Sequence, residues 1–183
     1  MNRHNYFTFL LLLIIGLQAQ AQQVIERQGQ VSYFSYTSVE NIEASNNQVL
    51  SVIDFTNNEI AISMLMKAFT FKKALMQEHF NESYIESDLY PKATFSGYIL
   101  DYDPSNLDTQ TKMVEGILTI HGVSKEVKIP AKIEKQNNRI ILSGDFEVKV
   151  NDFEIKIPPI LRSNIAKIIS ITFKFEYRPY EKE

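Results

Sequence analysis

Histidine is the side chain best suited to acid–base chemistry and metal binding near neutral pH, and this chain has three. His4 stands before an apolar N-terminal run, which leaves His79 and His121 for the folded part of the protein. A catalytic zinc site takes three protein ligands, and the chain has no cysteine to add to these two histidines. The sequence therefore predicts no metal site and no cofactor.

His121 lies in the segment GILTIHGVSKEVKIP, residues 116–130, between two runs in which apolar and polar residues alternate. Such alternation is typical of strands, and it places His121 at a strand end, on the face opposite to Leu118 and Ile120. Gly122 follows at a position that suits the positive φ of a tight turn. We interpret His121 as the residue that anchors this turn and points away from the interior.

The sequence contains no candidate residue for nucleophilic catalysis. The chain lacks a G-x-S-x-G motif, a glycine-rich phosphate loop and cysteine. Asp101 and Asp103 stand close together, but they belong to a predicted turn at Pro104, where carboxylates are ordinarily solvated. We therefore expect that the protein is not an enzyme.

Residues 71–82 change from the period of a strand to that of a helix. One interpretation makes Lys72 and His79 a polar pair that contacts a ligand head group at the mouth of the fold. The other makes His79 a partly exposed helix residue or a hydrogen-bonded core histidine. The apolar side of this predicted helix carries Phe71, Leu75, Met76, His79 and Phe80.

Residues 1–21 are typical of a signal peptide. A short positively charged start is followed by an apolar run of about a dozen residues and then by Ala19-Gln20-Ala21. This run is shorter than the roughly 18 residues that a transmembrane helix needs. We expect cleavage after Ala21, which leaves residues 22–183 as one periplasmic or secreted domain without a transmembrane segment.

Composition restricts the partners of this chain. The formal net charge is −3, from 19 basic and 22 acidic residues. Nucleic acid and anionic membranes attract clustered Lys and Arg, so this mild acidity argues against both. An exported chain without cysteine has no disulfides, and its stability must come from buried apolar area.

A period of two dominates the rest of the chain and predicts eight strands, three before the predicted helix and five after it. The strands after residue 92 each have one apolar and one polar face, and the connections are short enough for antiparallel neighbours. We expect an all-β, eight-stranded antiparallel barrel with one short α-helix after the third strand; a two-sheet sandwich is the alternative. Loops are expected at 38–48 and 151–165. The predicted strands are 30–36, 49–55, 59–69, 92–102, 112–121, 125–133, 139–150 and 167–177.

The inward faces of these strands could line an apolar lumen or form a packed core, since small barrels do either. Gly97, Gly116 and Gly144 fall on inward faces, and we interpret their missing side chains as room for a ligand. The methionines can adapt to a chain of uneven shape. The predicted lumen residues are Tyr33, Ile62, Met64, Met66, Phe95, Ile99, Leu118, Ile120, Ile129, Leu142, Phe146, Ile171 and Phe173.

Three segments resemble one family. The hairpin GILTIHGVSKEVKI (116–129) is similar to G-x-L-T-L-H-G-V-T-x-x-V-x-L, the hairpin of the YceI-like family of exported bacterial proteins. YPKATFSGYI (90–99) resembles the family's Y-P-x-A-T-F segment, and FEVKVNDFEIKIP followed by IISITFKFEY resembles its last two strands. The resemblance covers residues 24–178. The family's Asp and His-Ser pair before the first strand is missing here.

The resemblance implies a lipocalin-like barrel that binds an apolar lipid or an isoprenoid-type chain. The sequence thus favours an exported binding protein that holds such a chain in its lumen. The alternative is a structural or interaction protein with a filled barrel, which presents loops such as 38–48 and 151–165 to a partner in the cell envelope.

Overall fold

The computed structural model describes residues 23–37, 40–137, 139–157 and 166–180 of the chain. Within these ranges it contains nine strands and four short helical segments. The predicted signal peptide lies outside them. The strands are β1 (Gln23–Ser35), β2 (Ile42–Asp54), β3 (Glu59–Leu65), β4 (Thr70–Phe71), β5 (Lys92–Ile99), β6 (Gln110–Ile120), β7 (Val123–Gln136), β8 (Arg139–Lys149) and β9 (Ile168–Pro179). The helical segments are η1 (Met66–Ala68), α2 (Ala74–His79), η2 (Phe80–Tyr84) and η3 (Val150–Phe153).

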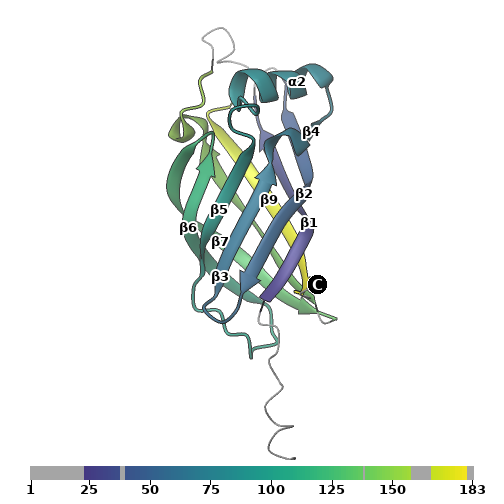
Figure 1. The fold of residues 1–183 in the computed structure, drawn as a ribbon, viewed down its shortest axis with the longest axis vertical. Helices are drawn as coiled ribbons and strands as arrows, with labels where there is room; N and C mark the ends of the chain where they lie inside the picture. Colours follow the sequence, from purple (N-terminus) through teal and green to yellow (C-terminus); the bar gives the residue numbers. More distant parts are fainter. Residues whose placement is uncertain (1–22, 38–39, 138, 158–165, 181–183) are drawn as a thin grey trace, which may run out of the picture.

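Eight long strands form a closed antiparallel barrel. Their order is β1-β9-β8-β7-β6-β5-β3-β2, and the sheet closes because β1 also pairs with β2. The two-residue strand β4 adds to β2, and α2 lies across the same end of the barrel (Figure 1). The predicted eight-stranded barrel with one short helix after the third strand is confirmed, and the two-sheet sandwich is wrong.

The apolar residues of the alternating pattern face the inside of the barrel, and the polar residues between them face the outside. Along β5 the buried residues are Ala93, Phe95, Gly97 and Ile99, while the residues between them are exposed. Successive side chains of a strand point to opposite faces, so this pattern fixes the register. The inner apolar face and the outer Lys, Thr and Ser side chains are therefore direct consequences of the sequence period.

The end of the barrel opposite α2 is filled. Val24 at the start of β1 pairs with Pro179 at the end of β9 there. Tyr177 is 1% exposed, and its hydroxyl lies 2.6 Å from Oγ of Ser51, which satisfies both buried polar groups. Ile99, a predicted lumen residue, is 2% exposed at this filled end. This end is a packed core.

The predicted loop 38–48 is wrong over most of its length, because β2 already begins at Ile42. Asn46, which lies within this predicted loop, is fully buried, and its side-chain amide donates to the Leu65 carbonyl at 2.9 Å. Its Oδ1 accepts from the backbone N–H of Gln48, and the register with β1 shifts at this point. The asparagine thus supplies hydrogen bonds to a bulge within a strand rather than to a turn.

The predicted helix 71–82 begins later than expected. Phe71 belongs to β4, which pairs with Ala44 of β2, and the α-helix starts only at Ala74. The η2 turn then continues the helical path to Tyr84. β1 begins at Gln23 rather than at residue 30, because irregular pairing around Gly29 hides its period of two. In the described part of the chain no helix is long and apolar enough to cross a membrane.

Candidate binding cavity

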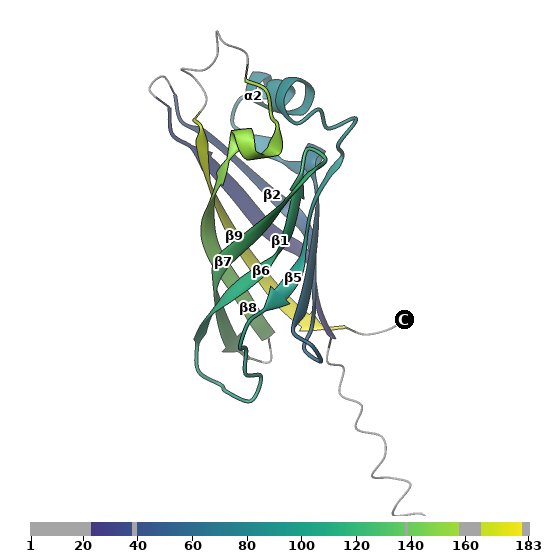
Figure 2. The same ribbon diagram turned by 90° about the vertical axis from the view of Figure 1, so that its left-hand side faces the viewer.

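A cavity of about 470 Å³ occupies the α2 end of the barrel. Residues on the inner faces of the strands form most of its wall, and residues of α2, η2 and η3 line it at the end that we call its mouth. Figure 2 shows α2 across this end of the barrel. This volume lies within the range of small-molecule binding pockets. Of the predicted lumen residues, these line it: Tyr33, Ile62, Met64, Met66, Phe95, Leu118, Ile120, Ile129, Leu142, Phe146, Ile171 and Phe173. Ile99 does not, since it lies in the filled end.

The inward glycines do not create this cavity, and their interpretation as empty room is wrong. A Cβ on Gly97 would lie 2.1 Å from the Glu115 carbonyl oxygen, because Gly97 and Gly116 face each other on adjacent strands. A Cβ on Gly144 would lie 2.7 Å from the ring of Phe173. These positions hold glycine because backbones and aromatic rings approach closely there.

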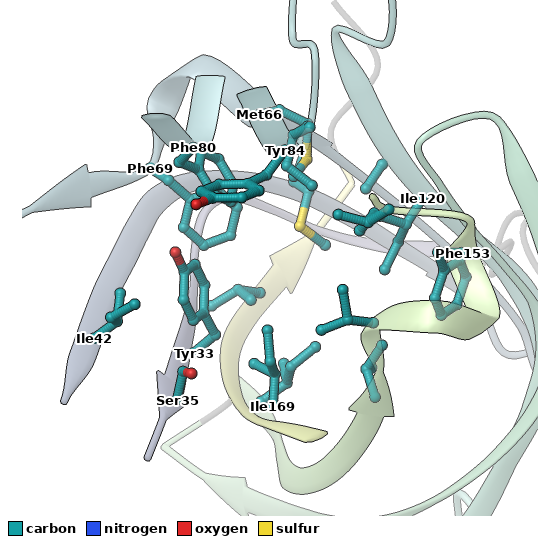
Figure 3. A pocket seen from close by; sticks show the side chains of 18 of the residues that line it. Tyr33, Ser35, Ile42, Met66, Phe69, Phe80, Tyr84, Ile120, Phe153 and Ile169 are labelled. Atoms are coloured by element: carbon teal, nitrogen blue, oxygen red, sulfur yellow. The ribbon is translucent and has the colours of Figure 1, made fainter. Parts of the chain in front are cut away.

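An aromatic cluster forms the wall of the cavity under the helical segment. The Tyr33 ring lies 5.7 Å from Phe69, 5.8 Å from Phe71 and 5.8 Å from Phe80, measured between centroids. Phe80 also lies 5.0 Å from Phe71. Figure 3 shows Phe69, Phe80 and Tyr84 above Tyr33 at this side of the cavity. The rings come from β1, from β4, from Phe69 just before β4 and from η2, so their contacts hold the helical segment on the barrel.

Charged side chains occur only at the mouth of the cavity, among the described residues that line it. Lys73 and Glu40 both line it and form an ion pair of 2.6 Å. His79 also lines it, on the exposed side of α2. Lys72, predicted to contact a head group with His79, lies outside the lining and pairs with Glu43 at 2.6 Å. Of that predicted pair, His79 alone lines the cavity.

The described residues contain no group of three or more histidine, aspartate or glutamate side chains that could hold a metal ion.

A model of the YceI-like domain matches residues 19–177 of the chain. The protein belongs to the YceI-like family. A search of curated protein sequences finds no significant match.

Solved structures share the fold of this YceI-like domain. A polyisoprenoid-binding domain from Saccharophagus degradans, implicated in plant cell wall breakdown, has a TM-score of 0.74 at 13% identity, over 88% of this chain and 100% of that domain. BcnA from Burkholderia cenocepacia has a TM-score of 0.69 at 17% identity, over 81% and 95%. The YceI protein of Campylobacter jejuni has 0.59 at 19% identity, over 80% and 90%. At identities this low, these matches show a common fold and nothing further.

The His121 turn of this YceI-like domain lies beside the cavity mouth. His121 and Gly122 have φ values of 52° and 74°, as the predicted tight turn requires. The imidazole does not point into solvent, however, since its side chain is only 10% exposed. Its Nε2 lies 2.9 Å from the Glu86 carboxylate, its Nδ1 lies 3.3 Å from the Phe153 carbonyl oxygen, and Tyr90 packs against the ring. His121 therefore joins the β6–β7 hairpin to η3 and to the segment after η2.

The sequence interpretation missed several residues of the cavity wall. Phe153, Ile155 and Ile157 alternate within the predicted loop 151–165, and all three line the cavity. Their period of two was a usable signal, which the following proline pair obscured. Residues 158–165 of that loop lie outside the described part. Tyr84 also lines the cavity, because η2 extends the helical segment beyond its predicted end.

Proposed function

We propose that this protein is an exported, non-enzymatic binding protein that holds an apolar lipid or an isoprenoid-type chain in its barrel. The observation that carries the proposal is the apolar cavity of about 470 Å³ at one end of a closed barrel whose other end is packed. Membership of the YceI-like family and the fold shared with a polyisoprenoid-binding domain support it.

The cavity suits an apolar chain on energetic grounds. Each buried methylene contributes about 0.8 kcal/mol, so a chain of ten would gain about 8 kcal/mol before the entropy cost of association. Burial of the apolar chain is therefore the main favourable contribution to the binding that we propose.

A direct test blocks the cavity. Ile120 lines it near the mouth, whereas Ile117 on the same strand is 41% exposed on the outer surface. Ile120→Trp should fill part of the cavity and weaken uptake of a fluorescent fatty-chain probe at least tenfold. Ile117→Trp makes the same change outside and should leave uptake unchanged. Circular dichroism of both variants controls for folding.

The natural ligand is best sought in the protein's own host. We expect native mass spectrometry of the purified protein, followed by lipid extraction, to find a co-purified apolar chain. If the unaltered protein neither carries such a chain nor takes up the probe, the lumen is not a binding site. The role of an interaction protein for the cell envelope would then replace this proposal.

Export is the second part of the proposal. It is supported by the short apolar run and the Ala19-Gln20-Ala21 site of the sequence. N-terminal sequencing of protein recovered from the periplasm or medium should begin at Gln22. Recovery of a chain that still begins at Met1 would contradict cleavage.

A further inference from the structure

Two tyrosine hydroxyls stand out in a cavity wall that is otherwise almost wholly apolar. Tyr33 of β1 and Tyr84 of η2 both line the cavity. Tyr33 stacks on Phe80 at 5.8 Å, and Tyr84 follows Phe80 by one helical turn. In Figure 3 both hydroxyls point into the same end of the cavity, beneath the helical segment. They form a pair of polar groups in apolar surroundings.

Neither hydroxyl is used by the described part of the protein. The other hydroxyls of the lining are engaged: Ser35 Oγ accepts from the backbone N–H of Ala166 at 3.3 Å, and Thr37 Oγ1 lies 2.6 Å from the Glu40 carbonyl oxygen. Within the described ranges, the hydroxyls of Tyr33 and Tyr84 have no hydrogen-bond partner in the protein. Burial raises the pKa of both phenols, so both keep their protons and act as donors.

A ligand that fills the cavity removes water from these donors. A hydroxyl that loses water without gaining an acceptor is destabilising. Binding of a pure hydrocarbon is therefore weakened by the desolvation of two hydroxyls. A carbonyl oxygen has two lone pairs and can accept from both phenols. A carboxylate would instead be drawn to the mouth, where His79 stands and where Lys73 is already paired with Glu40.

We propose that the ligand carries an uncharged hydrogen-bond acceptor, of the kind found in ketones, esters and amides, and that Tyr33 and Tyr84 donate to it beneath η2. This inference rests on the proposed function, because it assigns a position and a chemistry to one end of the bound chain. The apolar remainder of the chain then extends along β5, β6, β8 and β9 toward the filled end.

The test compares three competitors of equal chain length, a methyl ketone, a terminal alkene and a carboxylate, each displacing a fluorescent fatty-chain probe. A single hydrogen bond corresponds to about a fivefold change in affinity. The ketone should therefore bind at least fivefold more tightly than the alkene. Tyr33→Phe and Tyr84→Phe should each weaken ketone binding about fivefold and leave alkene binding unchanged or slightly stronger. Tyr98→Phe, at a tyrosine 51% exposed on the outside of β5, is the matched control and should change neither.

Several results would overturn the inference. Equal binding of ketone and alkene by the unaltered protein would show that no acceptor is recognised. Equal losses for both competitors in the tyrosine variants would show that the rings act only by packing. Tightest binding of the carboxylate, lost in His79→Ala, would place a charged end at the mouth. If neither the probe nor any competitor binds, the proposed function itself fails, and this inference fails with it.

Discussion

The facing glycines of β5 and β6 offer the sharpest test of how this barrel is built. Gly97 pairs directly with Gly116, and a Cβ on Gly97 would lie 2.1 Å from the Glu115 carbonyl oxygen and 2.7 Å from Gly116 Cα. Both obstacles are backbone atoms, so no side chain can rotate away. Gly97→Ala therefore forces the two strands apart.

The size of the effect follows from this geometry. Real Cβ atoms essentially never approach other heavy atoms within 3.0 Å, so the strands must separate locally by almost 1 Å. Such a shift lengthens the ladder hydrogen bonds on both sides of the pair, since strands lie only about 4.8 Å apart. Overpacking of this kind costs about 2–3 kcal/mol, which lowers the Tm of a domain of this size by about 4–12 °C.

Thermal and urea denaturation followed by circular dichroism measure this change. Ser96→Ala is the matched control, because Ser96 is the exposed neighbour on the same strand, and its Tm should change by about 2 °C or less. If inward glycines merely left room for a ligand, Gly97→Ala would keep the native Tm and would only reduce probe uptake. That result would refute the close-approach explanation.

Three further predictions concern the core, the mouth and the response to alkali. Leu118→Ala, at a residue 4% exposed on the inner face, should lower the free energy of unfolding by about 2–5 kcal/mol in urea melts, whereas Thr119→Ala on the outer face should cost far less. His121→Ala should speed hydrogen exchange of residues 80–90 with little change in the urea midpoint, because the imidazole joins Glu86 to the hairpin; unchanged exchange would contradict this. Burial raises the pKa of Tyr177 above its usual 10.0, so the native state keeps a proton that the unfolded chain releases, and stability should fall as pH rises above about 10. Urea melts at pH values from 8 to 11, in steps of about one pH unit, measure this trend. A urea midpoint that stays constant over this range would contradict it.

The strands could be predicted because one local rule decides them. Over most of β5 to β9 every second residue is apolar or glycine, and a single buried face demands that period. The predicted lumen residues of these strands followed from the same count, which is why Phe95, Leu118 and Phe146 were placed correctly on the inner face. Where a bulge interrupts the count, as around Gly29 and Asn46, the prediction failed.

The glycines failed for a different reason. A glycine on an inward face is compatible with empty space and with close contact, and only the partner across the strand distinguishes the two. Gly97 is in close contact with Gly116 on the neighbouring strand, and Gly144 is in close contact with the ring of Phe173, which lies 29 residues later in the chain. The choice is therefore made by pairing between strands, which no local pattern contains.

The cavity itself depends on contacts of still longer range. Ile99 and Ile120 have the same apolar pattern, yet one is packed at the filled end and the other lines the cavity. The positions of the large rings differ between the two ends. Tyr177 is buried at the filled end, where Phe175 packs against it and also lines the floor of the cavity. At the other end, Phe69, Phe71 and Phe80 pack with Tyr33 in the cluster under the helical segment. That cluster holds the helical segment over the mouth rather than in the lumen. The barrel is hollow at this end because the rings of Phe69, Phe71 and Phe80 pack under the covering segment and do not fill the lumen.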